Sequence, residues 1–197
     1  MKELTCRDVT LIQEKSGYKG FFSIKQYSLQ HSLFQGGQSR KLVRECFERG
    51  HAVGVLAYDP WCDAIVLLQQ FRIGAYINIM DNKSEASASP WLLEIIAGIV
   101  EPGESCSDVA HREAKEEAGL QLLAMEAIGD FYSSPGGSSE TTRLYCACVD
   151  SEGADGGLYG LDHEGEDILV KVVFWDGAVQ LLETGQLNNA SAMIAIQ

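Results

Sequence analysis

The sequence predicts an α+β fold built around a mixed β-sheet. Strand-like apolar runs outnumber helical segments, and the two kinds do not alternate as regular βαβ units would require. The chain has 197 residues, of which 46% are hydrophobic and 22% are charged. That length and composition are typical of one globular domain, or of one domain with a smaller appendage.

The first predicted strands lie in the N-terminal part of the chain. One strand is expected over Phe21–Tyr27, and the residues Gln35–Gln38 are typical of a turn. Two apolar runs, His51–Tyr58 and Ala64–Phe71, are also expected to be strands. The segment Asp59–Asp63 between them has the composition of a hairpin turn, so we expect these two strands to be neighbours.

A polar segment and a helix come next. Residues 77–90 have the composition of a mobile polar loop, and the apolar run that begins at Trp91 is strand-like. Ser105 and Asp108 make a start similar to a capping box, and Gly119 is a natural C-terminal stop. The sequence therefore predicts a helix between Ser105 and Gly119.

The last part of the chain returns to strands and then ends in helices. The three strand-like runs are Met125–Tyr132, Thr142–Val149 and Ile168–Trp175. Asp176 is expected to cap a second helix that Gly185 ends, and Asn189 is expected to cap a third. This third helix is apolar and breaks off at Gln197 without a stop signal, which suggests a truncated C-terminus.

The charge of the chain narrows the classes of partner. A formal net charge of −13 repels nucleic-acid backbones and anionic membranes. A small anionic substrate is compatible with this charge if metal cations stand between it and the protein. Residues 1–15 lack the apolar core of a signal peptide, and no run reaches transmembrane length. We therefore expect a cytoplasmic protein.

The cysteines and histidines form no ligand pattern. The six cysteines include no Cys-x-x-Cys pair and are too few for a disulfide scaffold. They are expected to be small buried hydrophobes in a reducing compartment. The four histidines are scattered without ligand spacing, so no zinc site is expected.

Acidic residues crowd together on the helix predicted after Ser105. Glu113 and Glu117 are four residues apart and share one face, Glu116 lies one step around it, and Glu104 lies just upstream. Such carboxylates repel one another unless cations are present, and clusters of oxygen ligands suit Mg²⁺ or Mn²⁺. The alternative is a solvated acidic helix face balanced by basic neighbours.

The residues around this helix follow a fixed pattern. The order is Gly98, five residues, Glu104, seven residues, Arg112-Glu113, two residues, Glu116-Glu117, one residue and Gly119. This arrangement resembles the box of the Nudix hydrolase family at every fixed position. The resemblance implies the Nudix fold, an α/β/α sandwich with a mixed sheet, together with a small N-terminal antiparallel β-domain. We expect the domains to be residues 1–48, for dimerisation and nucleoside contacts, and residues 49–197, for catalysis.

The resemblance also implies the roles of the box residues. The expected Mg²⁺ ligands are the Ala97 carbonyl, Glu113, Glu117 and, from a later loop, Glu166, with Mn²⁺ as a possible substitute. Arg112 would orient the carboxylates, and Glu116 would bind the metal directly or through water. Such a site would cut a diphosphate bridge, because bound Mg²⁺ neutralises phosphate oxygens and activates water.

Residues outside the box resemble one branch of the family. The segment SPGGSSE, at residues 134–140, and stretches such as QQFRIGAY and PWLLEIIAG are similar to bacterial ADP-ribose pyrophosphatases of the enterobacterial type. The likeness implies hydrolysis of ADP-ribose to AMP and ribose 5-phosphate. The alternatives are another nucleoside diphosphate sugar, ADP-glucose or GDP-mannose, and a sensor that binds ADP-ribose without cutting it.

The same likeness implies the groups that bind substrate. They are Phe21, Phe22, Arg44, Glu45, Arg72, Ile99, Ser134, Pro135, Gly136 and Glu140. The N-terminal members would reach the site of a second subunit, so a homodimer with exchanged N-terminal domains is implied. Two alternatives stay open. Phe21 and Phe22 would lie on opposite faces of a strand, which would put at least one in the core, and Arg44 and Glu45 are also compatible with a surface ion pair.

A second acidic cluster lies in the loop Leu161–Asp167. Gly165, between Glu164 and Glu166, is typical of a mobile loop that closes over a site. The resemblance assigns Glu164 as the general base and Glu166 as a metal ligand, and these roles are open to exchange. The alternative is a solvated acidic loop without a function in catalysis.

Overall fold

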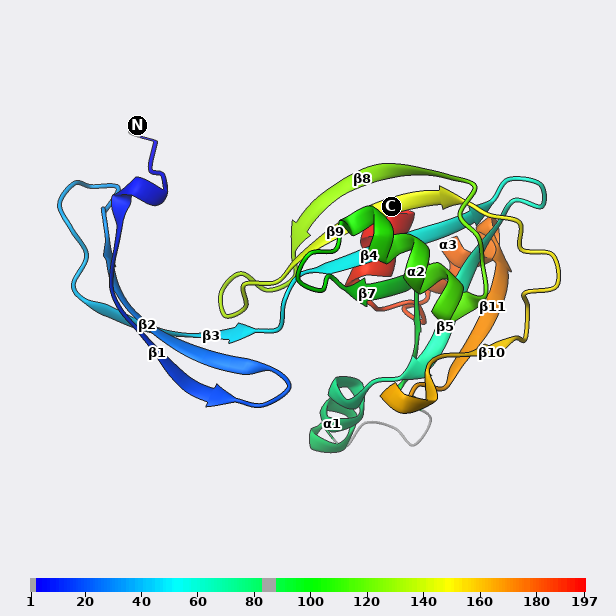
Figure 1. The fold of residues 1–197 in the computed structure, drawn as a ribbon, viewed down its shortest axis with the longest axis horizontal. Coiled ribbons are helices and arrows are strands. Elements are labelled where there is room, and N and C mark those ends of the chain that lie inside the picture. The colour runs from blue at the N-terminus through cyan, green and yellow to red at the C-terminus, as the bar shows by residue number, and fades with distance from the viewer. Residues whose placement is uncertain (1–2, 83–87) are drawn as a thin grey trace. The chain divides into compact units, whose positions relative to one another are not determined.

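The chain divides into two compact units. A computed structural model describes residues 3–82 and 88–197, and Figure 1 shows its helices and strands. The N-terminal unit runs to His51 and includes Tyr132–Thr141, whereas the main unit comprises Ala52–Phe131 and Thr142–Gln197. The N-terminal unit thus contains a segment, Tyr132–Thr141, that the proposed division into residues 1–48 and 49–197 leaves with the second domain.

The N-terminal unit is a three-stranded antiparallel sheet. After the short 3-10 helix η1 (Cys6–Asp8), its strands are β1 (Val9–Lys19), β2 (Ser23–His31) and β3 (Leu42–Glu48), and β2 lies in the middle. Every residue of β1 is exposed. This sheet agrees with the small N-terminal antiparallel β-domain that the resemblance implies.

The remaining elements follow in chain order. They are β4 (Ala52–Asp59), β5 (Ala64–Phe71), α1 (Ile73–Asp81), β6 (Trp91–Glu94), β7 (Ile96–Ile99), α2 (Cys106–Ala118), β8 (Ala124–Tyr132), β9 (Thr141–Cys148), β10 (Leu158–Tyr159), the 3-10 helix η2 (Asp162–Glu164), β11 (Ile168–Phe174), α3 (Trp175–Glu183) and α4 (Ala190–Ile196). The predicted hairpin turn between β4 and β5 is confirmed, and the two strands pair antiparallel at this turn.

The sheet of the main unit is mixed, as predicted. Its order is β10-β11-β5-β4-β9-β8, and β4 pairs with β9 in parallel. The β4–β5 hairpin stays paired only near its turn, because β6 pairs with the later half of β5 and β7 with the first half of β4. The apolar run that begins at Trp91 therefore forms two short strands, β6 and β7, which are separated by Ile95.

Helices cover both faces of this sheet. One core cluster joins Val109 and Ala114 of α2 to strand residues such as Val55, and a second joins Ala178 of α3 and Ile196 of α4 to the opposite face. Figure 1 shows α2 in front of the sheet and α3 behind it. The expected α/β/α sandwich is confirmed.

Two local expectations for the N-terminal half were wrong. β2 begins at Ser23, so Phe21 and Phe22 lie in the turn between β1 and β2 rather than on opposite faces of a strand. Residues 73–81 form helix α1, so the predicted loop over 77–90 begins later than expected. The run IGAYINIM contains no proline, and its apolar residues are compatible with a helix; residues 83–87 of that loop lie outside the described residues.

The C-terminal helices match the expectations in part. Asn189 caps α4, as predicted, because its Oδ1 accepts hydrogen bonds from the backbone of Ser191 and Ala192. The prediction that Asp176 caps α3 was wrong, since the N-cap is Phe174 and Asp176 lies within the first turn. A carboxylate in the first turn still faces the positive end of the helix dipole, which favours the helix without a capping hydrogen bond.

Candidate active site

Local sequence fixes helix α2 at both ends. At the N-cap, Ser105 Oγ accepts a hydrogen bond from the Asp108 N–H at 3.2 Å. At the C-terminal end, Gly119 adopts a left-handed φ of 67°, and its N–H donates to the Lys115 carbonyl. The predicted start and stop of this helix are therefore confirmed, and the helix packs beside β7.

Glu117 and Glu113 are held near β7 by two different contacts. Glu117 is only 3% exposed, and its Oε2 accepts a hydrogen bond from the Ala97 N–H at 2.9 Å. Glu113 lies against the bare Cα of Gly98, where an added Cβ would stand 1.8 Å from Glu113 Oε1. The glycine at position 98 therefore makes room for a carboxylate.

Arg112 connects the carboxylates of the box. Its Nη1 donates to Glu113 Oε1 at 2.7 Å and to Glu116 Oε2 at 3.1 Å. Its Nε and Nη2 donate to the two carboxylate oxygens of Glu104 at 3.2 and 3.3 Å. Nη2 also lies 3.5 Å from the Ile99 carbonyl. One guanidinium therefore holds three acidic side chains through charge-assisted hydrogen bonds.

The electrostatics of this cluster disfavour the ionised carboxylates. Burial and the charges of Glu113 and Glu166 together raise the pKa of Glu117 to about 8, although the hydrogen bond from the Ala97 N–H opposes them. Burial also raises the pKa of Glu113 to about 7 against the influence of Arg112. These carboxylates need nearby positive charge if they are to be ionised together at neutral pH.

This donor set fits a hard divalent cation. The fit is seen in the space that Gly98 leaves for Glu113 and in the all-oxygen character of the groups around it. In residues 3–82 and 88–197, no three His, Cys, Asp or Glu side chains are already gathered at metal-ligand spacing.

Of the two loop glutamates, Glu166 lies near the box carboxylates. It is close enough to both Glu113 and Glu117 to raise their pKa values. Its Oε2 accepts a hydrogen bond from the Leu161 N–H at 3.1 Å. The same loop is joined to α2, because the Gly160 N–H donates to the Glu116 carbonyl at 3.3 Å.

Glu164 is the last residue of η2 and is exposed. Its side chain is 56% exposed, and its Oε1 is 3.7 Å from His163 Nε2. The following residue, Gly165, has a left-handed φ of 71°. The structure thus brings one of the two predicted loop glutamates to the carboxylates and leaves the other in solvent.

Arg72 stands at the end of β5, where it precedes helix α1. Its guanidinium is near enough to Glu117 and Glu166 for their charges to act on it, and it forms an ion pair with Glu94 at 2.6 Å. The sequence analysis missed Glu94. Glu94 is the one charged residue within the apolar run WLLEIIAGIV. Because charged side chains are rarely buried without a partner, its position in this run could have indicated a buried ion pair.

The predicted residues of the N-terminal unit form two groups. Phe22 lies edge-on to Phe21 and to Phe47, with centroid distances of 4.8 and 5.1 Å. Arg49 lies over the Phe22 ring at 5.4 Å, and its Nε is 3.2 Å from Glu140 Oε1. Glu140 and Phe22 therefore meet at Arg49, which the sequence analysis missed.

The other predicted residues of this unit are exposed. Phe21 is 90% exposed, and Arg44 and Glu45 are neighbours on β3 that face solvent. Ser134, Pro135 and Gly136 form an exposed turn in which the Ser134 carbonyl accepts hydrogen bonds from the backbone N–H groups of residues 137 and 138. The alternative that at least one of Phe21 and Phe22 lies in a core was wrong, because Phe21 is exposed and Phe22 is only half-buried.

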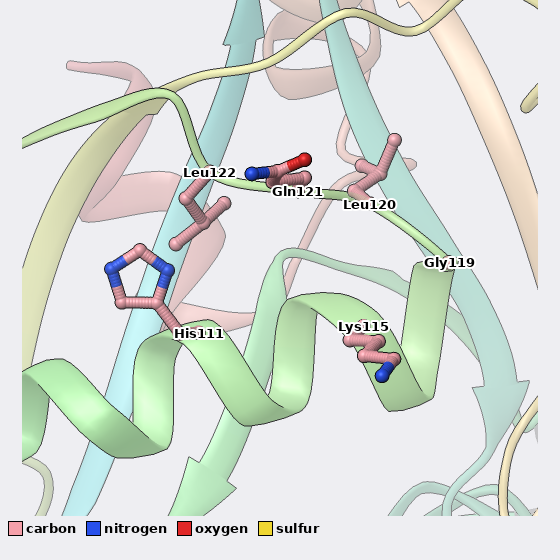
Figure 2. Close-up of a pocket in the computed structure, with 6 residues that line it drawn as sticks. All are labelled: His111, Lys115, Gly119, Leu120, Gln121 and Leu122. Carbon is pink, nitrogen blue, oxygen red and sulfur yellow. The ribbon is translucent and has the colours of Figure 1, made fainter.

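A separate cavity lies on the other side of α2. Its volume is about 320 Å³, and its lining residues are His111, Lys115, Gly119, Leu120, Gln121 and Leu122. Figure 2 shows the His111 ring rising from the helix toward Leu122, whereas the Lys115 side chain lies over the last turn of the helix. None of the predicted site residues lines this cavity, so α2 presents different chemistry on its two sides.

Comparison with known proteins identifies the family. Residues 48–189 match the family model of the NUDIX domain. Because this match covers most of the chain, the chain belongs to the Nudix family. No helix within the described residues is long and apolar enough to cross a membrane.

The curated relatives are similar over nearly the whole chain. An ADP-ribose pyrophosphatase of Escherichia coli is 45% identical over 190 residues, which cover 96% of this chain and 87% of that protein. The enzyme of the same name from Haemophilus influenzae is 42% identical over 97% of this chain and 85% of its own length. A GDP-mannose pyrophosphatase of Pectobacterium atrosepticum is 27% identical over 96% of this chain and 92% of its own length.

The fold also matches a solved structure. The crystal structure of an ADP compounds hydrolase superposes with a TM-score of 0.69 and 20% identity. The match covers 100% of this chain and 93% of that one. At this level of identity the likeness concerns the fold alone, and it agrees with the arrangement of helices and strands described above.

Proposed function

We propose that this chain hydrolyses the pyrophosphate bond of ADP-ribose and releases AMP and ribose 5-phosphate, with Mg²⁺ as its metal and Mn²⁺ as a substitute. The observation that carries the proposal is an intact Nudix box, in which Arg112 holds Glu113 and Glu116 and the Ala97 N–H holds Glu117. The substrate is supported by relatives named ADP-ribose pyrophosphatase, which are similar over 96% of this chain.

In this proposal, Glu113, Glu117, Glu166 and the Ala97 carbonyl hold the metal. Bound Mg²⁺ supplies charge neutralisation at the diphosphate oxygens and lowers the pKa of water. Arg112 fixes the orientation of the carboxylates through its hydrogen bonds, and Glu116 joins the metal directly or through water. The raised pKa values of Glu113 and Glu117 are consistent with carboxylates that ionise together only beside a cation.

Glu164 is the proposed general base. Its exposed carboxylate stands beside Gly165, so the loop can bring it to a bound substrate without disturbing the sheet. There it takes the proton of the attacking water. Arg72 contacts a phosphate or ribose oxygen, because its guanidinium lies near the carboxylates that would hold the metal.

The N-terminal unit supplies the adenosine contacts and a dimer interface in this proposal. Phe21 and Phe22 stack against adenine, and Arg44 and Glu45 line the same pocket together with Ser134–Gly136 and Glu140. Ile99 of the main unit is a further proposed substrate contact. Within the described residues of this unit, no apolar side chain is buried. A homodimer with exchanged N-terminal strands would cover the exposed apolar side chains of this unit. Such cover would stabilise the sheet, because three strands need a buried hydrophobic face to be stable.

A substrate panel tests the proposal. The protein is incubated with ADP-ribose, ADP-glucose, GDP-mannose or NADH in the presence of Mg²⁺, and the nucleotide product is measured by chromatography. We expect the highest kcat/KM for ADP-ribose, loss of activity with EDTA, and recovery on addition of Mg²⁺ or Mn²⁺. A poor rate with ADP-ribose, or full activity in EDTA, contradicts the proposal.

The panel also separates the alternatives. Preference for GDP-mannose would fit the relative that is 27% identical and named for that substrate. Binding of ADP-ribose without turnover would indicate a sensor. The intact set of box carboxylates supports an enzyme over a sensor.

A further inference from the structure

Glu94 is a buried carboxylate whose two oxygens contact different parts of the main unit. It ends strand β6 and is 4% exposed. Its Oε2 accepts hydrogen bonds from Arg72 Nε at 2.9 Å and from Arg72 Nη2 at 2.6 Å. Its Oε1 accepts a hydrogen bond from Asn189 Nδ2 at 2.9 Å. A buried charge is stable only with such partners, so all three side chains are constrained together.

Asn189 is itself fixed by helix α4. Its Oδ1 caps the helix by accepting hydrogen bonds from the Ser191 N–H at 3.0 Å and the Ala192 N–H at 3.3 Å. The helix is anchored because Ala192 and Ile196 are buried in the core. With the amide oxygen held by the helix, the amide nitrogen has one direction left, toward Glu94.

In the described part of the chain, the Arg72 guanidinium is hydrogen-bonded on one edge only. Its Nε and Nη2 donate to Glu94, and the Arg72 backbone N–H donates to the Pro90 carbonyl at 2.9 Å. Among the described residues, none accepts a hydrogen bond from Nη1. The side chain is 44% exposed and lies within the electrostatic influence of Glu117 and Glu166. The open edge is therefore available to an anionic ligand of the carboxylate cluster.

We infer that Asn189 and Glu94 are positioning residues for Arg72, so that the start of the C-terminal helix sets the direction in which the guanidinium meets a substrate phosphate. This inference rests on the proposed function. One oxygen of Glu94 accepts hydrogen bonds from two nitrogens of the guanidinium, and these two charge-assisted bonds fix its orientation. Asn189 prevents the Glu94 carboxylate from rotating. Residues that lock a binding group in this way determine how well it meets its ligand.

The substitution Asn189→Ser separates capping from positioning. Serine retains a capping oxygen for α4 but has no amide to reach Glu94. We expect kcat/KM for ADP-ribose to fall about tenfold, mainly through a higher KM, because Arg72 binds the substrate before and during reaction. Asn189→Asp should lower it further, since this variant caps the helix but places a second carboxylate beside Glu94. The exposed neighbour Asn188 provides the matched control, and Asn188→Ser should leave kinetics unchanged.

A double-mutant cycle with Arg72→Ala shows whether the effect passes through Arg72. In that background, Asn189→Ser should change kcat/KM by less than about twofold, because the group it positions is gone. An equal fall in both backgrounds would mean that Asn189 acts only on the fold and would overturn the inference. No fall in either background would overturn it as well.

A second readout needs no turnover. The Arg72 Nε–H signal in nitrogen-15 NMR should exchange slowly with solvent in the intact protein and in Asn188→Ser, and faster in Asn189→Ser. An unchanged exchange rate in Asn189→Ser overturns the positioning role. A wild-type protein that cleaves no compound of the panel refutes the proposed function instead, and the NMR result then decides the positioning role by itself.

Discussion

The two units of this chain obtain their stability in different ways. The main unit has two apolar clusters, one under α2 and one under α3 and α4, and many of their side chains are fully buried. In the described part of the N-terminal unit, the buried residues are polar: Ser28, Ser39 and Glu140. Its contacts include Tyr27 Oη donating to Glu48 at 2.9 Å and Ser139 Oγ donating to Glu48 at 2.6 Å.

This difference between the units indicates a different role for each in the proposed function. The main unit has enough apolar contact to hold buried carboxylates in place, which the proposed metal chemistry requires. The N-terminal unit presents aromatic and charged groups on a sheet in which, over its described residues, no apolar side chain is buried. Changes in the main unit should therefore act on turnover and on unfolding, and changes in the N-terminal unit on assembly and nucleoside binding.

The largest effect should come from the proposed base. Glu164→Gln should lower kcat for ADP-ribose roughly 10²- to 10⁴-fold, because the attacking water loses its proton acceptor. The side chain is exposed, so unfolding and assembly should stay unchanged. Steady-state kinetics measure the effect, with the exposed Glu152→Gln as the control. A near-normal kcat in Glu164→Gln would transfer the role to another residue, with Glu166 as the first candidate.

The comparison of the two units is tested directly by one leucine from each. Leu67 is 0% exposed in the core, and Leu67→Ala should lower the free energy of unfolding by about 2–5 kcal/mol. Leu11 is 55% exposed on β1, so Leu11→Ala should hardly change this free energy but should weaken the proposed dimer. Urea denaturation and analytical ultracentrifugation measure the two quantities. A large loss of unfolding free energy in a monomeric Leu11→Ala protein would contradict the proposed difference between the two units.

A smaller effect is expected at the glycine beside the box. In Gly98→Ala, the new methyl group would displace the Glu113 carboxylate, which is the end of a flexible side chain, so the fold should persist. We expect kcat/KM and Mg²⁺ affinity to fall roughly 10- to 100-fold, the range for lost support of metal ligands. Metal titration by calorimetry and steady-state kinetics check this. Gly129→Ala, where the added methyl would meet no atom within 4 Å, is the control and should behave as wild type.

The smallest effect concerns a structural carboxylate of the main unit. Ser151 donates to Asp59 from its hydroxyl at 2.6 Å and its N–H at 2.9 Å, and these bonds lower the pKa of Asp59 to about 2. Because the folded-state pKa lies below the unfolded value of about 3.9, the stabilisation is present above pH 4 and lost as pH falls toward 2. This stabilisation amounts to about 2–3 kcal/mol. Unfolding free energies measured from pH 5 to pH 2 should decline more steeply in wild type than in Asp59→Asn, and equal slopes would contradict the assignment.

Sequence reasoning reached the local parts of the site more easily than the distant ones. Glu113 and Glu117 were predictable because their spacing places both on one helix face, and Ser105 and Gly119 mark the ends of that helix. Glu94 was missed because its partners, Arg72 and Asn189, come from other elements, and no spacing rule connects them. Arg49 was missed for the same reason, because the segment Ala52–Phe131 of the main unit separates it in the sequence from its ion-pair partner Glu140.

The wrong local predictions have physical causes too. Phe21 and Phe22 have high strand propensity. However, the pairing of β1 with β2 ends at Lys19 and Ser23, so these two residues lie in the turn that joins the strands. Helix α1 was hidden because the polar residues that follow it gave residues 77–90 the composition of a loop. In α1, the apolar residues Ile73, Ile77 and Met80 are exposed. The helix therefore has no buried apolar face whose spacing in the sequence would have indicated it.

The parallel pairing of β4 with β9 has a consequence for how the molecule is made. β4 covers residues 52–59, whereas its partner covers 141–148, so this edge of β4 stays unpaired until the ribosome has released the later strand. Pairings between such distant segments form slowly, because a long stretch of chain must be ordered first. Newborn chains thus expose one edge of a central strand until β9 has been synthesised.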